Sequence, residues 1–331
     1  MRFLIHYFII ERMKSLRFID FCAGIGSGRL GLEQAGMKCV GYSEIDQRAI
    51  KTYNLLHDVG LEENFGDLTK IDIKKLPDFD VMIAGFPCQT FSIVGRRKGF
   101  EDERGQIIYH LIKILKGKNV PYFILENVKG LASHDKGSTI GIIKSSLEEA
   151  GYSVDYRILT STDFGVPQIR ERVYFVGARK DLVKKPFTWP TPIYTKMNLR
   201  DYLVEGRELS ENPKKTLIRY MENKYNAGRF KLEELLRIDY LVVDTRQSDM
   251  RLFEGRVPTL RTGRQGILYV RGGKLWSLTG YEGLLLQGFP KEYAGKVRGN
   301  VANSILLAQA GNAMTVSVVA GLAKEVADWA R

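Results

Sequence analysis

The sequence predicts an α/β protein built on a doubly wound, mostly parallel sheet, with a second, smaller domain. Short and nearly continuous apolar runs alternate with helical patterns through the first half of the chain, which is typical of buried parallel strands joined by helices. A glycine-rich turn follows the first of these runs. Three prolines in "KKPFTWPTP" mark the change to a second region.

The elements of the first domain follow from these patterns. Apolar runs bounded by Gly, Pro or acidic residues predict strands over 15–22, 38–44, 79–86 and 121–127. Two further strands are predicted over 152–160 and 171–179. Helices are predicted over 105–117, where an apolar face repeats at helical spacing, and over 138–151, where Gly151 stops the pattern.

The last segment, 315–331, is apolar at helical spacing and is expected to pack back on the first sheet. Residues 187–302 are rich in Gly and Arg and poor in long periodic runs. We therefore predict a first domain of residues 1–186 plus 303–331 and a second domain of residues 187–302.

The composition narrows the classes of function. Of 331 residues, 44% are hydrophobic, which is enough for a folded core. The formal net charge of +12 favours a polyanionic partner. Three cysteines without paired spacings predict reduced thiols and no metal. The apolar run of residues 1–10 is too short to span a bilayer, so no membrane segment is predicted, and Met13 is an alternative start.

The turn "DFCAGIGSGRLG" leaves two cofactor classes open. Gly26, Gly28 and Gly31 satisfy G-x-G-x-x-G, so a nicotinamide-dinucleotide enzyme and a purely structural turn are about equally favoured by this motif. Glu44 ends the second predicted strand, where its carboxylate is able to accept hydrogen bonds from ribose hydroxyls. That suits more than one nucleotide cofactor.

Cys88 decides between these classes. Cys22 and Cys39 lie in strand patterns and are expected to be small core residues. Cys88 instead follows Pro87 at the carboxyl end of the third predicted strand, and a polar, basic loop comes after it. Ligands bind at that edge of open α/β sheets, so the thiol is placed to act as a nucleophile.

Two further groups are predicted at the same edge. Glu126 ends the fourth strand, and Arg170 and Arg172 lie in "QIRER". Taken alone, Glu126 would be interpreted as a cap or a surface acid, and the two arginines as solvated charges at a strand edge. Together with Cys88 they supply a thiol, a carboxyl donor and two cations, a set suited to attack on an anionic, hydrogen-bonding ring.

These motifs resemble the cytosine-carbon-5 DNA methyltransferases, specifically the small bacterial restriction-modification type. The resemblance runs from about Leu16 to the C-terminus, and only the region 187–274 lacks landmarks apart from "PTL" at 258–260. The matching motifs, in order, are "DFCAGIGSG", "GYSEID", "GDL", "GFPCQTFS", "ENV", "QIRER", "LTGYEGLLLQGFP" and "QAGNAMT".

The resemblance implies a Rossmann-like S-adenosylmethionine-dependent fold with a target recognition domain. It implies methylation of carbon 5 of a cytosine flipped out of a short specific duplex sequence. Cys88 would add to carbon 6 and Glu126 would stabilise the ring through nitrogen 3, while Arg170 and Arg172 would hold the base and its phosphate.

The resemblance also implies the binding residues. Two positions depart from the family: Cys22 stands where Phe is common, and Ile45 where Trp is frequent. The cofactor S-adenosylmethionine, released as S-adenosylhomocysteine, would contact Asp20, Gly24, Gly26, Glu44, Ile45, Asp67, Leu68, Pro87 and Asn312.

DNA contacts are expected in two places. The residues between 245 and 274 carry seven basic and two acidic side chains, and most of these charges are expected to contact phosphates. Arginine and glutamine also read guanine and adenine edges. The predicted DNA contacts are Gln89, Ser92, Arg96 and Arg97 after Cys88, and Arg246, Gln247, Thr259 and Arg261 in the second region.

Three other functions stay open at this point. One lineage with these motifs methylates transfer RNA, although a separate recognition region of about ninety residues favours duplex DNA. A catalytically silent DNA-binding protein is less consistent with an intact Cys88, Glu126 and arginine pair. A dinucleotide-dependent oxidoreductase leaves "FPCQ" and "QIRER" unexplained. We expect a cytoplasmic monomer acting on double-stranded DNA, without physical need of a restriction endonuclease.

Overall fold

The computed structural model describes residues 15–60, 63–87, 107–263 and 265–331. Its larger sheet has six strands in the order β2-β1-β3-β4-β7-β5. The pairs β1–β2, β1–β3 and β3–β4 are parallel, and β7 runs antiparallel to both of its neighbours. The bounds are β1 Arg17–Phe21, β2 Lys38–Ser43, β3 Val81–Gly85, β4 Tyr122–Val128, β5 Tyr152–Thr160 and β7 Glu171–Arg179.

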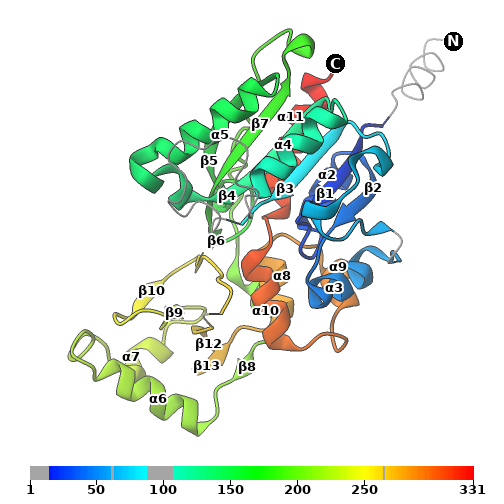
Figure 1. Cartoon of the computed structure of the whole chain (residues 1–331). Helices are drawn as coiled ribbons and strands as arrows, with labels where there is room; N and C mark the ends of the chain where they lie inside the picture. The colour runs from blue at the N-terminus through cyan, green and yellow to red at the C-terminus, as the bar shows by residue number, and fades with distance from the viewer. Residues whose placement is uncertain (1–14, 61–62, 88–106, 264) are drawn as a thin grey trace, which may run out of the picture.

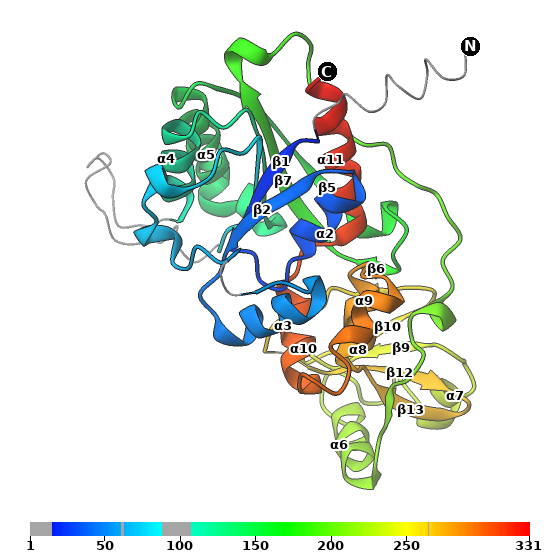
Figure 2. The same cartoon turned by 90° about the vertical axis from the view of Figure 1, so that its right-hand side faces the viewer.

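Helices cover both faces of this sheet, because alternate side chains of each strand are apolar on both sides. Phe18 and Ile83 point toward α2 and α11, whereas Ile19 and Met82 point toward α4 and α5. Figure 2 shows these layers edge-on. The helices are α2 Ser27–Gln34, α3 Gln47–His57, α4 Ile107–Gly117, α5 Ser138–Glu149 and α11 Val316–Trp329. The predicted doubly wound, mostly parallel sheet is confirmed.

The second region holds a five-stranded antiparallel sheet in the order β10-β9-β12-β13-β8. Two helices pack on one face through Leu217 and Leu235, which contact Val243 and Val270. The elements are β8 Arg207–Glu208, α6 Glu211–Met221, α7 Leu232–Leu236, β9 Val242–Asp244, β10 Arg251–Phe253, β12 Ile267–Arg271 and β13 Lys274–Ser277.

Three helices lie between the two sheets (Figure 1). They are α8 Gly280–Leu286, α9 Lys291–Lys296 and α10 Asn303–Asn312. One core cluster joins Leu30 and Leu56 of the first sheet's helices to Tyr269, Leu284 and Leu307. The two regions therefore share apolar packing, and the predicted boundaries at 186/187 and 302/303 stay a prediction.

A short parallel ladder also connects the regions. It pairs β6 Gln168–Ile169, just before β7, with β11 Val257–Pro258 of the second region. The backbone N–H of Val257 extends the ladder by donating to the carbonyl of Pro167 at 2.7 Å. The "PTL" and "QIRER" motifs are thus side by side.

The C-terminal segment packs on the first sheet, as predicted. Among the described residues, 303–329 is the one stretch long and apolar enough to cross a membrane by length and composition. It consists of two helices, and Val318, Leu322 and Val326 of the second are buried against the sheet. The apolar stretch is explained by core packing.

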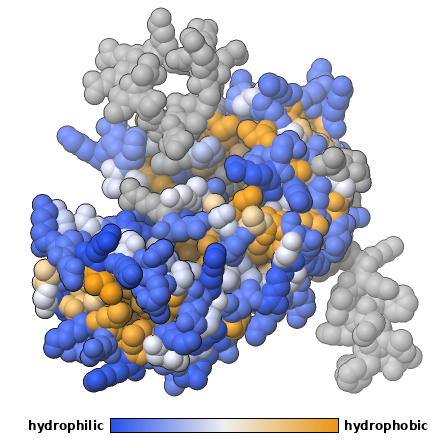
Figure 3. All heavy atoms as spheres, turned by 90° about the horizontal axis from the view of Figure 1, so that it is seen from below, coloured by the Kyte–Doolittle hydropathy of each residue, from blue (hydrophilic) through white to orange (hydrophobic). Residues whose placement is uncertain are grey.

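Hydrophilic side chains cover most of the face seen from below, with smaller apolar patches between them (Figure 3).

Candidate active site

A cavity of about 590 Å³ opens at the carboxyl edge of the six-stranded sheet. Its walls come from the ends of the first four strands, from the start of β7 and from the end of α10. They are lined by Cys22, Ala23, Gly24, Ile25, Ser27, Glu44, Asp46, Ala49, Gly85, Phe86, Pro87, Glu126, Asn127, Val128, Arg170, Arg172, Thr262, Gln309, Gly311, Asn312, Ala313 and Met314.

The turn after β1 forms one wall because its backbone is left-handed. Cys22, Gly24 and Gly26 have φ of 51°, 57° and 79°. At Gly26 a side chain is also excluded by packing, since a Cβ there would lie 2.2 Å from Nε2 of His57. The glycines therefore let the turn fold tightly before α2 starts at Ser27.

Glu44 braces this turn across the sheet edge. Its carboxylate accepts hydrogen bonds from the backbone N–H groups of Gly24 at 2.7 Å, Ile45 at 2.8 Å and Asp46 at 2.9 Å. Because a carboxylate offers about four acceptor positions, capacity for one further hydrogen bond is left at the cavity. A ligand hydroxyl is the donor that this site would take.

Asp20 lies behind the same turn and does not line the cavity. The residue is fully buried, and its carboxylate accepts a hydrogen bond from the backbone N–H of Arg29 at 3.0 Å. Burial raises the pKa of Asp20 well above its usual value. Its position fixes the start of α2, and its predicted contact with a cofactor stays a prediction.

Three predicted cofactor contacts, which the resemblance places at the adenine, are outside the cavity lining. Ile45 is 66% exposed, and Leu68 belongs to the core beneath α4. The Asp67 carboxylate accepts hydrogen bonds from the backbone N–H and the hydroxyl of Thr69, at 2.9 and 2.7 Å. Asp67 thereby caps a short helical turn, and contacts of these residues with adenine stay predictions.

Glu126 and Arg172 form an ion pair in the cavity. Nε of Arg172 lies 3.0 Å from Oε1 of Glu126, and both side chains are largely buried. Burial raises the pKa of Glu126, although the charges of Arg172 and Arg170 act in the opposite direction. A buried carboxyl group with a raised pKa is suited to donate a proton or to share one.

Arg170 has a different environment from Arg172. Its buried guanidinium donates to the backbone carbonyls of Ala313 at 2.7 Å, Gly311 at 3.1 Å and Leu260 at 3.4 Å. We expected this side chain to hold the base or its phosphate. In the structure its hydrogen bonds fasten three segments of the chain, and contact with the base or its phosphate stays a prediction.

The third strand brings Pro87 to the cavity, and Phe86 before it is held by the fourth strand. The Asn127 side chain donates to the carbonyl of Phe86 at 2.9 Å. Cys88 follows directly, but it lies outside the described residues. So do four of the predicted DNA contacts: Gln89, Ser92, Arg96 and Arg97.

Arg246 is part of the fold of the second region. Its Nε lies 2.7 Å from Asp244, both side chains are almost completely buried, and its Nη1 donates to the carbonyl of Thr259 at 2.7 Å. Burial would raise the pKa of Asp244, but Arg246 and Arg251 hold it below its usual value. Its donors serve this ion pair and the backbone, and a base contact by Arg246 stays a prediction.

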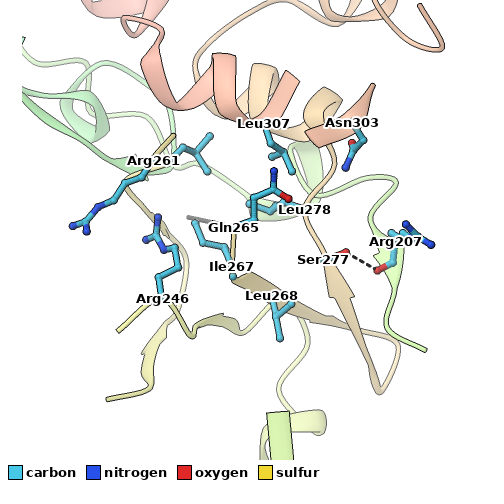
Figure 4. Close-up of a pocket in the computed structure, with 12 residues that line it drawn as sticks. Arg207, Arg246, Arg261, Gln265, Ile267, Leu268, Ser277, Leu278, Asn303 and Leu307 are labelled. Atoms are coloured by element: carbon cyan, nitrogen blue, oxygen red, sulfur yellow. Dashed lines mark hydrogen bonds between the residues drawn. The ribbon is translucent and has the colours of Figure 1, made fainter. Parts of the chain in front are cut away.

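Thr259 is likewise engaged within the protein: its hydroxyl donates to the carbonyl of Ile169 at 2.5 Å. A base contact by Thr259 stays a prediction. Gln247 is partly exposed, and Arg261 is exposed. Arg261 lines a hollow of about 180 Å³ and extends away from Gln265 and Leu307 (Figure 4). Base contacts by Gln247 and Arg261 stay predictions.

The described residues contain no group of three or more His, Cys, Asp or Glu side chains placed to hold a metal ion. Comparison with known proteins then gives the family. Residues 16–328 match the family described as C-5 cytosine-specific DNA methylase. The chain belongs to this family.

Two relatives show how far the likeness extends. The methylase is 37% identical to the Type II methyltransferase M.SsoII of Shigella sonnei over 314 residues, which cover 94% of this chain and 79% of that protein. It is 48% identical to the orphan methyltransferase M.Rho11sI of Bacillus phage rho11s over 174 residues. That match covers 52% of this chain and spans 35% of the phage protein.

Solved structures confirm the fold. The S. pombe Dnmt2 methyltransferase superposes with a TM-score of 0.68 at 20% identity, covering 95% of the methylase and 98% of that chain. At this identity the likeness concerns the fold alone. The predicted family and fold class are both confirmed.

Sequence reasoning missed several residues of this cavity, among them Asn127, Gln309 and Thr262. Asn127 lies inside the "ENV" motif, of which only Glu126 was predicted to belong to the site. Gln309 begins "QAGNAMT", and its side chain links α10 to α3 by donating to the carbonyl of Arg48 at 3.0 Å. Thr262 follows "PTLR", but nothing in its neighbours' pattern indicated that it meets the C-terminal segment.

His57 packs behind the glycine turn that follows β1 and gives a pH-dependent prediction. Burial, together with the charge of Arg29, lowers the pKa of His57 to about 3 from 6.5. The folded state therefore favours the neutral ring, so stability is lost as pH falls below 6.5. Between pH 6.5 and 4.5 we expect the unmodified protein to lose about 2 kcal/mol more unfolding free energy than His57→Phe.

Urea unfolding at the two pH values measures this difference. His134→Gln is the matched control, since His134 is only partly buried and contacts Thr139 at 2.7 Å. Equal acid sensitivity of His57→Phe and the unmodified protein would show that His57 is not held neutral by the fold.

Proposed function

We propose that the chain is a DNA (cytosine-5-)-methyltransferase. It transfers a methyl group from S-adenosylmethionine to carbon 5 of a cytosine flipped out of a short specific duplex sequence, and releases S-adenosylhomocysteine. One observation carries the proposal: the Glu126–Arg172 pair shares a cavity with the glycine turn and Glu44. Pro87 lies at the same cavity, one residue before Cys88.

The cavity residues fit this cofactor. The turn at Gly24 presents backbone without side chains, and the Glu44 carboxylate has acceptor capacity left for a ribose hydroxyl. Asn312 lines the opposite side. When bound, S-adenosylmethionine supplies an electrophilic methyl group on a sulfonium sulfur.

The side chains of the chain divide the reaction on the base between them. Carbon 5 of cytosine is a poor nucleophile, so the Cys88 thiolate adds to carbon 6 and pushes electron density toward carbon 5. Glu126, whose pKa is raised by burial, shares a proton with ring nitrogen 3, and Arg172 orients that carboxyl group. After carbon 5 has taken the methyl group, a base removes its proton and the thiolate leaves carbon 6.

Transfer of radiolabelled methyl groups tests the activity directly. The protein is incubated with labelled S-adenosylmethionine and either duplex DNA or transfer RNA. We expect 5-methylcytosine in DNA only. Label in transfer RNA alone would assign the enzyme to the lineage that methylates transfer RNA. DNA binding without transfer would favour the silent binding protein, and hydride transfer with a nicotinamide cofactor would favour the oxidoreductase.

Arg261 and Arg246 are predicted to respond differently to substitution by alanine. Arg261→Ala should leave the unfolding free energy unchanged and cost about 1–3 kcal/mol of binding to the cognate sequence. Arg246→Ala should lower the unfolding free energy by about 1–3 kcal/mol, because the buried Asp244 then keeps only the partly exposed Arg251, 3.5 Å away, as its partner.

Chemical unfolding and DNA-binding titrations at two salt concentrations separate these effects. If Arg261→Ala weakened all sequences alike and flattened the salt dependence, Arg261 would be a phosphate contact and not a reader of bases. A fully stable Arg246→Ala would contradict the structural role of the Asp244 pair.

The setting of the enzyme follows from its relatives. The Type II designation of M.SsoII supports a place in a restriction-modification system. A cognate endonuclease would share the target sequence and would not need to bind the methyltransferase. We propose that the enzyme acts as a monomer on DNA in the cytoplasm.

A further inference from the structure

Two chain segments of different origin meet beside the cavity. Residues 260–262 begin at the last residue of the "PTL" motif of the second region, and residues 311–313 end α10 and lead to α11. Thr262 from the first segment and Asn312 from the second both line the cavity. One wall of the cofactor and target site is therefore built jointly by the predicted recognition region and the C-terminal segment.

The backbones of these segments are in direct contact at Gly311. A Cβ at Gly311 would lie 2.6 Å from both the carbonyl carbon of Arg261 and the backbone nitrogen of Thr262. Real side-chain carbons do not approach backbone that closely, so only glycine allows this packing. A displacement of the 261–262 peptide must therefore be met by a displacement of Gly311.

Hydrogen bonds reinforce the contact on either side of Gly311. The Thr262 hydroxyl shares its proton between the carbonyl of Ala308 at 2.8 Å and the side-chain oxygen of Asn312 at 2.7 Å. Arg170 joins the same segments through the carbonyls of Leu260 and Gly311. Thr262 is thus the side chain of the recognition region that holds Asn312 at the cavity.

Arg261, the residue before Thr262, lines a different hollow from Thr262. Arg261 is exposed and extends from the hollow in Figure 4, while Thr262 lines the cavity. A phosphate or base edge bound by Arg261 acts on the same peptide unit that packs on Gly311. Two neighbouring residues of this segment therefore line two different hollows. We expect DNA at the hollow beside Arg261 and the cofactor at the cavity beside Thr262.

We propose that Thr262 is a positioning residue that couples DNA binding at Arg261 to cofactor binding beside Asn312. This inference rests on the proposed function and adds a route by which one ligand changes the affinity for the other. Such coupling is reciprocal: if DNA tightens cofactor binding, the cofactor tightens DNA binding by the same factor.

Calorimetric titration with S-adenosylhomocysteine tests the route without turnover. The dissociation constant is measured with and without cognate duplex DNA, and the ratio of the two values is the coupling factor. For the unmodified enzyme we expect a factor in the range of roughly 5–150. Thr262→Val should bring this factor close to one, since the hydroxyl is lost, and Thr262→Ser should retain it.

Thr216→Val is the matched control, because the Thr216 hydroxyl contacts only the carbonyl of Asn212 among the described residues, on exposed α6. It should keep the coupling factor. The inference is overturned if the unmodified enzyme shows no coupling, if Thr262→Val keeps it, or if Thr262→Ser loses it too. Normal methyl transfer alongside any of these results leaves the proposed function standing. Absence of methyl transfer to DNA would contradict the function itself.

Discussion

Cys88→Ala is expected to lose methyl transfer by roughly 10⁴-fold or more, the range seen when a covalent nucleophile is removed. Without the thiolate, carbon 5 of cytosine is not activated toward the methyl donor. Binding of duplex DNA should change little, because the thiol is needed for the covalent step and not for recognition. Initial rates with labelled S-adenosylmethionine and DNA-binding titrations measure the two effects separately.

Cys39→Ala is the control for this experiment, since the Cys39 thiol lies on β2 outside the cavity, packs against the core and donates to the carbonyl of Gly41 at 3.4 Å. It should keep normal rates. A complementary trap uses DNA with 5-fluorocytosine, from which fluorine does not leave as a proton. A denaturant-resistant adduct should form at Cys88. An adduct at another residue, or near-normal turnover of Cys88→Ala, would overturn the assignment of the nucleophile.

Glu126→Gln should reduce turnover by roughly 10²–10⁴-fold, which is typical of a lost proton donor. The amide keeps the shape of the side chain but has no acidic proton, and it loses the ion pair with Arg172. DNA affinity should be nearly unchanged. An equal loss of affinity and turnover would indicate that Glu126 serves mainly to hold the strand end.

The pH dependence of this variant gives a second measurement. Burial raises the pKa of Glu126 against the opposing charges of Arg172 and Arg170. The active, protonated form should therefore persist to higher pH than for an ordinary glutamate, and the rate should fall as pH rises through the raised value. Glu126→Gln should lack that fall. Glu171→Gln, next to Arg172 but paired with exposed Lys129, should retain it.

Local pattern was sufficient for the strands of the first domain. All six predicted strands occur within two residues of their predicted ends, and α5 ends as expected before Gly151, whose φ is 99°. Buried parallel strands need apolar side chains on both faces, which leaves a continuous signal in the sequence. The strands of the second region are only two to five residues long, so they leave no comparable run in the sequence, although β9 is buried on both faces.

The roles of individual arginines were harder to predict. Arg170, Arg172, Arg246 and Arg261 all lie in motifs or basic stretches, and composition treats them alike. In the structure, Arg172 meets Glu126, Arg170 and Arg246 serve backbone carbonyls and a buried aspartate, and Arg261 is exposed. Apart from Asp244, which lies two residues before Arg246, the partners that made these distinctions lie far along the chain.

The sequence alone determined the class of sheet, the edge at which chemistry-bearing residues gather, and the family to which the chain belongs. Each depends on residues close together along the chain or on motif order. Only the tertiary structure decided which polar groups face the cavity, and that Thr262 and Asn312 share a wall although fifty positions separate them. The physical reason is that hydrogen bonds and ion pairs act over about 3 Å, and folding, not sequence distance, determines which groups come that close.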